Sequence, residues 1–291
     1  MGHHFVPQRY LRNFEDPSRP GYTWVHDRRG GEARLASIAK VAQSRNFYSQ
    51  STETVLAKTV ERPANPVINK LTSHHAITSL ERGQLAYYVA VMMKRIPAHR
   101  RHSSEMLPGT LADVVNNVRQ QLAALANHAG ADPEILRRRA LELDAVERKF
   151  QVHPPPEVIE QIREPWPSKE MTELLFRMTW RVLISAGPIY FLTTDNPAFY
   201  FRGLGLSRRE SEVSFPLSTL CALHGSWQLA DSDLVFMNAE QAIVKEINRR
   251  LVSESERLIF YHQAADWLPK LSENKNLSLN KIEWQRGHFG C

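Results

Sequence analysis

The sequence predicts a helix-rich α+β fold with a short N-terminal hairpin and a small, mainly antiparallel sheet in the C-terminal half. Apolar residues recur at helical spacing through residues 53–150, whereas short strand-like runs separated by turn residues follow residue 185. Helices and strands that occupy different parts of a chain are typical of the α+β class. The 291 residues are 42% hydrophobic, which is enough to bury a full core.

Two turn clusters indicate the N-terminal hairpin. Residues 16–21 and 28–31 are rich in proline, glycine and aspartate or arginine, a composition that favours turns. Residues 22–26 lie between them and carry strand-forming side chains, and residues 33–38 can return as the hairpin partner. The rest of residues 1–50 is predicted to be short and irregular.

Two helices are predicted next. The first covers about residues 53–71, although Pro63 and Pro66 should break or kink it because proline lacks the backbone N–H that a helix needs. The second covers about residues 79–96 and has a strong apolar band. Ser79 is its predicted N-cap, without an acidic residue at the capping-box position.

Residues 110–150 are predicted to form two further helices separated by a turn. Asp132 is the expected N-cap of the second one, and Pro133 is expected at its first helical position, where the missing N–H costs nothing. A proline-dense connector follows at residues 153–167. It is the best candidate for a boundary inside a chain that is otherwise predicted to be a single domain, 1–291, with subdomains 1–152 and 168–291.

The C-terminal half is predicted to contain two helices among several short strands. The helices cover about residues 168–184 and 239–251. The strands cover about residues 188–194, 211–217, 219–224, 231–237 and 257–261.

Composition narrows the function without defining it. The formal net charge is +6 and comes largely from arginine, which suits bidentate contacts with phosphate or carboxylate groups. A nucleic acid or another phosphate-bearing ligand is therefore one open partner class, although many basic proteins bind neither. The two cysteines are too few for a disulfide framework, and no apolar run is long enough to span a membrane. The sequence thus predicts a cytoplasmic protein without a membrane partner.

The first candidate site is the segment that begins with His3 and His4. Neighbouring side chains of a strand point to opposite faces, so the two imidazoles cannot bind one ion together. We predict that His4 is catalytic and that His3 and Arg9 bind substrate. The alternative is that both histidines only form local hydrogen bonds.

The second candidate lies at residues 94–102, which hold several basic and imidazole side chains at the end of a predicted helix. Cations at this position complement the helix dipole, which is the structural explanation. Because Arg95 is close to the helix-breaking Pro97, its backbone is fixed and its guanidinium can be aimed at an anion. Arg95 is therefore the predicted substrate-binding residue of this group.

The third candidate follows the predicted strand 188–194. Asp195 and Asn196 stand where that strand ends, a position at which the strand holds side chains rigidly. Asp195 suits a general base, a metal ligand or the partner of a histidine, and both residues are predicted to be catalytic. The alternative is an Asx-turn that only closes the loop. Glu53 and Glu61, about 80° apart on a helix, are weaker acidic candidates.

No GxSxG, HExxH, P-loop, GxGxxG or paired CxxC motif occurs, so the common hydrolase, kinase and dehydrogenase templates are largely excluded. A different pattern is present. It consists of the opening segment 3–14, Asn46-Phe47-Tyr48, Arg95-Ile96-Pro97, Trp180, Thr194-Asp195-Asn196-Pro197 and Phe215-Pro216-Leu217-Ser218. This series resembles the bacterial domain-of-unknown-function family 4238 over most of the chain. Because that family is uncharacterised, the resemblance implies no catalytic residues.

Together these candidates favour a nuclease-like phosphoester hydrolase. In this hypothesis His4 and Asp195 act as acid–base groups or hold a divalent metal, and Arg95 stabilises developing negative charge. Two other classes stay open. One is a non-catalytic module that binds a nucleotide, another anion or nucleic acid, and the other is an interaction protein of a bacterial conflict system, such as a toxin or defence component.

Overall fold

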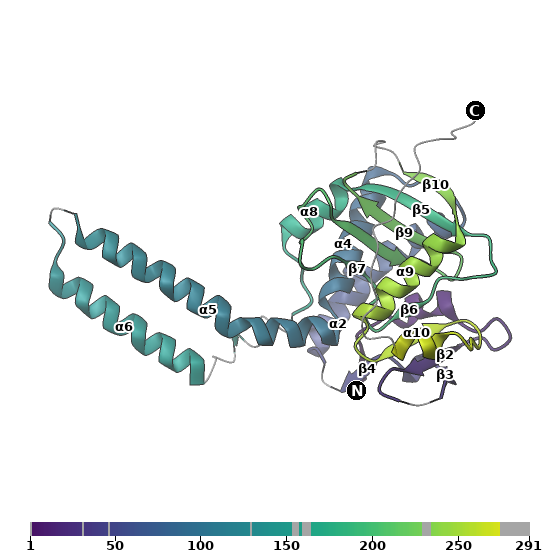
Figure 1. The fold of residues 1–291 in the computed structure, drawn as a ribbon, viewed down its shortest axis with the longest axis horizontal. Coiled ribbons are helices and arrows are strands. Elements are labelled where there is room, and N and C mark those ends of the chain that lie inside the picture. Colours follow the sequence, from purple (N-terminus) through teal and green to yellow (C-terminus); the bar gives the residue numbers. More distant parts are fainter. Residues whose placement is uncertain are drawn as a thin grey trace. The chain divides into compact units, whose positions relative to one another are not determined.

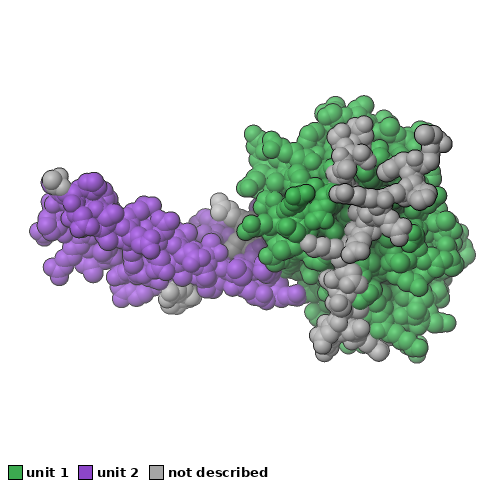
Figure 2. Space-filling view, turned by 45° about the horizontal axis from the view of Figure 1, so that its top comes forward, with its two compact units in different colours: residues 1–98, 165–291 green, residues 99–164 purple. Residues whose placement is uncertain are grey.

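The computed structural model describes residues 2–30, 32–45, 47–128, 130–152, 157–158, 164–228 and 234–273 (Figure 1). Two compact units are present (Figure 2). Unit 1 combines residues 1–98 with residues 165–291, and unit 2 comprises residues 99–164. Most of the predicted connector 153–167 lies outside the described residues. The single-domain organisation with two subdomains stays a prediction.

Unit 1 begins with short elements, as predicted. They are β1 (Gly2–His4), α1 (Gln8–Leu11), the 3-10 turn η1 (Arg12–Phe14), β2 (Tyr22–Asp27), β3 (Arg34–Ser37), η2 (Ile38–Lys40) and β4 (Gln43–Arg45). The predicted hairpin is confirmed, because β2 and β3 pair antiparallel with Tyr22 opposite Ser37. β1 pairs antiparallel with β4, so the two histidines lie in a two-stranded ribbon.

The hairpin extends into a four-stranded sheet of order β3-β2-β11-β6, formed with β11 (Leu258–Tyr261) and β6 (Thr193–Thr194). The strand predicted at residues 188–194 is thus confined to its last two residues. Its earlier backbone groups bond elsewhere, since Phe191 N–H donates to the Thr219 carbonyl and Leu192 N–H to the Asn248 side chain.

The predicted first helix is unbroken but changes pitch. It consists of α2 (Gln50–Val55), the π-helix η3 (Leu56–Glu61) and α3 (Arg62–Thr72). The helix is therefore not broken at Pro63 and Pro66, and the kink expected as the alternative stays a prediction. Pro63 falls in the first turn of α3, where the absent N–H is tolerated, and Pro66 is accommodated inside the helix.

The second helix is confirmed as α4 (Ser79–Lys94). Its cap lies one residue earlier than predicted and is stronger. Thr78 accepts the N–H of Glu81, and the Glu81 carboxylate accepts the N–H of Thr78, which completes a capping box.

A five-stranded sheet forms the centre of unit 1. Its order is β10 (Val235–Ala239), β5 (Thr179–Ser185), β9 (Cys221–Ser226), β8 (Glu212–Pro216) and β7 (Phe199–Tyr200). All neighbours pair antiparallel except β10 and β5, which confirms a mainly antiparallel sheet. The helix predicted at residues 168–184 is wrong beyond α8 (Lys169–Arg177), because residues 179–185 form the strand β5.

Helices cover the two faces of this sheet. α9 (Gln241–Glu254) packs on one face against Leu183 and Ala222, and α10 (Leu268–Glu273) lies beside α9 (Figure 1). α3 and α4 pack with Val182 and Phe215 in the other apolar cluster. Adjacent strand residues thus point to opposite layers, and the sheet is buried on both faces.

Unit 2 is largely a helical hairpin of α5 (Pro97–Ala126) and α6 (Pro133–Val152). The predicted start of the second helix is confirmed, because Pro133 occupies its first position and the Asp132 carboxylate accepts the N–H of Glu134 at 2.8 Å. Among the helices of the described residues, none is long and apolar enough to cross a membrane.

Candidate functional site

The opening segment binds the motifs that follow it in the sequence. The His3 imidazole accepts the backbone N–H of Tyr48 at 3.1 Å, and the His4 carbonyl accepts a guanidinium N–H of Arg95 at 2.6 Å. The Tyr48 hydroxyl in turn donates to the Arg95 carbonyl at 2.5 Å. β1 is therefore held to α4 and to the segment before α2 by polar contacts from both histidines.

Tyr10 and Asn13 continue this pattern further into the core. The buried Tyr10 hydroxyl donates to the Pro216 carbonyl at 2.7 Å and lies 2.9 Å from the hydroxyl of Thr193, which must then be the donor. The Asn13 side chain donates to the Leu217 carbonyl at 2.8 Å. The segments around Tyr48, Arg95 and Pro216-Leu217, three of those in the sequence pattern, thus contact residues 3–13.

Arg95 is the centre of a polar cluster in this region. Its side chain is 1% exposed and forms an ion pair with Glu61 in which Nη1 and Oε1 are 2.6 Å apart. The second guanidinium nitrogen binds the His4 carbonyl described above. Glu61 therefore already neutralises the charge of Arg95. Through Glu61 of η3 and the His4 carbonyl of β1, Arg95 holds these two elements together.

Several polar atoms of this cluster are buried without a partner. Among the residues that the structure describes, His4 Nε2, Glu53 Oε2, the Tyr88 hydroxyl and Arg95 Nε have no hydrogen bond. Buried polar atoms are nearly always paired, so a group of four is typical of a place where water, an ion or a ligand binds. His4, Glu53 and Glu61 are partly exposed, so the cluster reaches the surface.

The environment shifts the pKa values of His4 and Glu53 toward each other. Burial raises the pKa of Glu53 above its ordinary 4.5, opposed by Arg95. Burial lowers the pKa of His4 below its ordinary 6.5, with the charge of Arg95 acting in the same direction and the Ala39 carbonyl opposing. Burial also raises the pKa of Tyr88 well above 10, which keeps its hydroxyl protonated. The arrangement favours a neutral imidazole at His4 and a protonated carboxyl at Glu53, and both groups interact electrostatically with Arg95.

The π-helix η3 places Glu61 in this cluster. A π-helical turn inserts residues relative to an α-helix, and such turns occur frequently at functional sites. Glu53 lies on α2 before η3, and Glu61 is its last residue. Both carboxylates interact electrostatically with Arg95, so the helix brings them to the same cation despite the change of pitch.

A family model described as "Protein of unknown function (DUF4238)" matches residues 2–265. The chain belongs to the DUF4238 family. Searches among curated proteins and among solved structures found no match. The match runs from β1 to the loop after β11, and so includes both halves of unit 1 together with the hairpin of unit 2.

Asp195 of this DUF4238 protein binds the backbone rather than a histidine. Its carboxylate accepts the N–H groups of Glu256, Arg257 and Leu258 at 2.9, 2.7 and 2.8 Å. The side chain is 3% exposed, and burial raises its pKa to about 6 against these three hydrogen bonds. Asp195 thus fixes the start of β11 against β6.

We expect Asp195→Ala to lower the free energy of unfolding by about 2 kcal/mol at pH 7, because three backbone N–H groups lose their acceptor. The pKa of about 6 in the folded state exceeds the ordinary 3.8, so Asp195 makes a further contribution that is fully present below pH 3.8 and is lost as the pH rises through 6. The loss in the variant should therefore grow on acidification, as measured by urea unfolding at pH 4 and 7. Exposed Asp113→Ala is the control, and equal losses at both pH values would contradict the raised pKa.

The other predicted site residues fall in different places. Asn196 donates to the Glu254 carbonyl at 3.1 Å and is buried beside Asp195. Arg9 is exposed and lies 3.5 Å from the Asn69 side chain. No hydrogen bond or ion pair in the described part of the chain joins His4 to Asp195. The catalytic and substrate-binding roles predicted for these residues stay predictions, and only His3, His4 and Arg95 share one cluster.

The described residues do not form a set of metal ligands. Across the described residues, no group of three or more His, Cys, Asp and Glu side chains is arranged to hold a metal ion. A groove of about 470 Å³ lies between η3, α3 and α4, lined by Thr59, Val60, Pro63, Ser79, Leu80, Gly83, Gln84 and Tyr87. None of these residues belongs to the Arg95 cluster.

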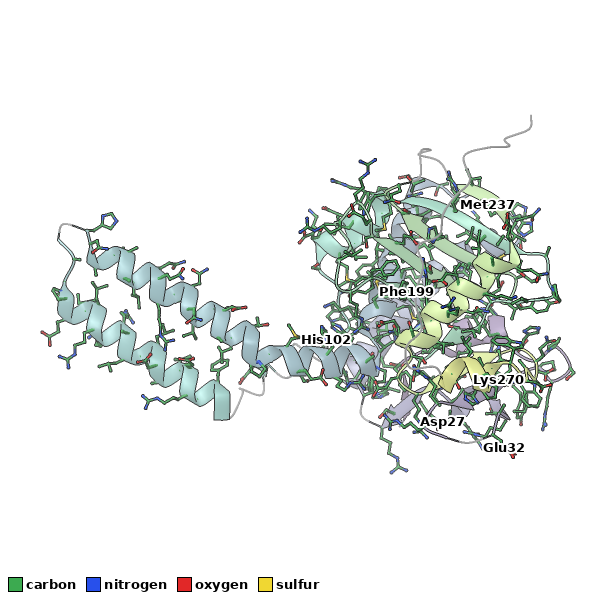
Figure 3. All side chains as sticks on the ribbon, viewed as in Figure 1. Asp27, Glu32, His102, Phe199, Met237 and Lys270 are labelled. Atoms are coloured by element: carbon green, nitrogen blue, oxygen red, sulfur yellow. The ribbon has the colours of Figure 1, made fainter. Side chains whose placement is uncertain are left out.

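A second buried group of ion-paired side chains was not predicted from the sequence. Arg250 on α9 is fully buried and pairs with Glu212 of β8 at 2.8 Å and with Glu246 at 3.4 Å. Its guanidinium also lies over the rings of Phe201 and Phe199, the latter labelled in Figure 3. The spacing of Glu246 and Arg250, four residues apart on a predicted helix, was the available signal.

Proposed function

We propose that this DUF4238 protein is a hydrolase in which His4 is the general base and Glu53 is the general acid. The observation that carries this proposal is the presence of His4 Nε2 and Glu53 Oε2, buried and without a partner, in one partly exposed cluster. A histidine kept neutral and a carboxyl kept protonated are in the states that a general base and a general acid need. Arg95 is a positioning residue, because it fixes the His4 backbone and Glu61.

Phosphate esters, including nucleic acids, are the substrate class that we propose. The net charge of +6 favours anionic substrates. The sequence predicted catalytic roles for His4, Asp195 and Asn196. In this proposal only His4 keeps that role, and Asp195 and Asn196 support the fold.

The pH dependence of the reaction tests the assignment. His4 must be neutral to act as a base, and its pKa lies below 6.5, while Glu53 must be protonated to act as an acid, and its pKa lies above 4.5. We therefore expect a bell-shaped profile of kcat/KM, in which the acidic limb reports the lowered pKa of His4 and the alkaline limb the raised pKa of Glu53. Bis-(p-nitrophenyl) phosphate and single-stranded RNA and DNA oligonucleotides serve as substrates, with and without Mg²⁺.

Glu53→Gln and His4→Asn should each lower kcat/KM by about 100-fold or more, and each should remove one limb of the profile. His102→Asn and Glu105→Gln, two exposed positions on α5, are matched controls and should leave the rate unchanged. Activity within threefold of the parent in folded Glu53→Gln and His4→Asn proteins would refute the assignment. Absence of cleavage at every pH would refute the proposed reaction.

An interaction protein is the second candidate function. It is favoured by the helical hairpin, which carries half of the large apolar side chains exposed among the described residues: Met106, Val114, Leu125, Ile135, Leu141 and Val146.

A further inference from the structure

The helical hairpin of unit 2 is held together by one seam. Val115 of α5 is 2% exposed, Leu122 and Leu143 are partly buried, and Val115 and Leu122 are on the same side of α5 as Arg119. One side of the seam is closed by Arg119 of α5, which pairs with Asp144 and Glu147 of α6 at 2.7 and 2.6 Å. The two helices therefore form a fixed antiparallel pair with one ion-paired face.

Exposed apolar side chains mark the opposite face. Val114 and Leu125 of α5 are 55% and 52% exposed, and Ile135 and Val146 of α6 are 50% and 46% exposed. Successive residues of a helix are about 100° apart. Val114 and Leu125 therefore lie roughly 130° around α5 from Arg119. On α6, Ile135 and Val146 lie roughly 140° around the helix from Asp144 and Glu147. Both apolar pairs thus occur on the side of the hairpin that the ion pairs leave uncovered.

Each pair belongs to a ridge with the same spacing. On α6 the ridge is Ile135, Arg139, Glu142 and Val146, at positions i, i+4, i+7 and i+11. On α5 it is Val114, Val118, Gln121 and Leu125, again at i, i+4, i+7 and i+11. Residues at this spacing share one side of a helix, and each ridge is about 16 Å long. Both ridges are apolar at their ends. The middle of the α6 ridge is the oppositely charged pair Arg139 and Glu142, and the middle of the α5 ridge is Val118 and Gln121.

This order makes the face complementary to itself. Consider a two-fold axis that lies in the contact plane and is perpendicular to the helices. It places each ridge opposite the same ridge of the second copy, running in the opposite direction. Ile135 then meets Val146 of the second copy, and Arg139 meets Glu142 of the second copy. The same axis sets Val114 against Leu125 of the second copy, because the midpoints of both ridges are about equally far from the turn between α5 and α6. A two-fold contact of this kind is isologous, the commonest arrangement in homo-oligomers.

The charges of the hairpin favour a second copy over nucleic acid. Residues 99–150 contain eight Arg and Lys and seven Asp and Glu, so the segment is nearly neutral. The positive charge of residues 137–139 is partly neutralised within the hairpin, since Arg138 and Arg139 pair with Glu142 at 3.7 and 2.8 Å. A neutral surface with apolar ridge ends has no affinity for phosphate backbones, which bind to clustered positive charge.

We propose that two copies of this chain dimerise through this face of the hairpin, as an antiparallel four-helix arrangement. Val114, Leu125, Ile135 and Val146 form the apolar contacts. Arg139 and Glu142 set the register, because any other antiparallel alignment of α6 separates them or opposes like charges. The contact is small, so the dimer is expected to dissociate in the micromolar range.

The experiment measures the mass of the full chain by light scattering and sedimentation at up to roughly 100 μM, where a micromolar complex is mostly formed. We expect a dimer for the parent and a monomer for Ile135→Ser combined with Val146→Ser. Leu141→Ser is the matched control, because Leu141 is 59% exposed on the other side of α6 and should not affect the mass. Circular dichroism verifies that every variant keeps its helices.

A charge exchange tests the register independently. R139E and E142R should each be monomeric alone, since like charges then face each other across the axis. An equimolar mixture of the two variants should form a heterodimer, in which every facing pair is again of opposite sign. A monomeric parent at all concentrations would overturn the proposal. So would a dimer that survives the Ile135 and Val146 substitutions, or a failure of the mixture to associate.

Discussion

Replacing Arg250 with methionine is expected to lower the free energy of unfolding by about 4 kcal/mol, the largest loss from any single substitution considered. Arg250 has no exposed surface, and its partner Glu212 has a side chain that is 3% exposed. Removing the cation takes a close ion-pair partner from a buried carboxylate, which costs more than the pair itself contributes. Urea unfolding followed by tryptophan fluorescence measures the loss.

A second variant separates charge from packing. Glu212→Gln in the Arg250→Met background removes the buried negative charge that has lost its Arg250 partner, so part of the lost stability should return. In the parent, burial and the charges of Arg250 and Arg181 lower the pKa of His224 to about 3, so His224 adds no charge to this group at pH 7. A loss below 1 kcal/mol in Arg250→Met would show that the ion pair is not a structural element of the sheet.

Arg95→Met should cost about 3 kcal/mol by the same mechanism. Glu61 and the His4 carbonyl both lose their partner, and Glu61 can recover part of its hydration because its side chain is 19% exposed. Arg101→Met is the control, since the Arg101 side chain is 54% exposed and its pairing with Glu105 contributes at most about 1 kcal/mol. Equal losses in the two variants would contradict a central role of Arg95.

Local signals account for the parts of the fold that the sequence predicted well. The β2–β3 hairpin has turn residues at both ends, and α6 begins with a proline after an aspartate cap. β5 shows the limit of this reasoning. Trp180, Val182 and Leu183 are all buried because helices cover both faces of the sheet, so the run has no alternation and resembles a buried helix.

The candidate site was predictable only in pieces. His4 and Arg95 were singled out by residue type and position, but their contact depends on how β1 pairs with β4, which no local pattern encodes. Glu53 looked like one acid on a solvated helix face. Its importance arises from burial and from the position of Arg95, more than 40 residues later in the sequence. Long-range packing therefore decides which of many polar residues form a site.

The contacts of Tyr10 also determine when unit 1 can fold. They join residues 183 and 206 positions apart in the chain, and unit 1 is built from two segments that flank the hairpin. During synthesis the opening segment leaves the ribosome first and must wait for β6 and β8, whereas α5 and α6 can pair as soon as both are made. Closing so long a loop is slow, so unit 1 is expected to acquire its native contacts after the hairpin has formed.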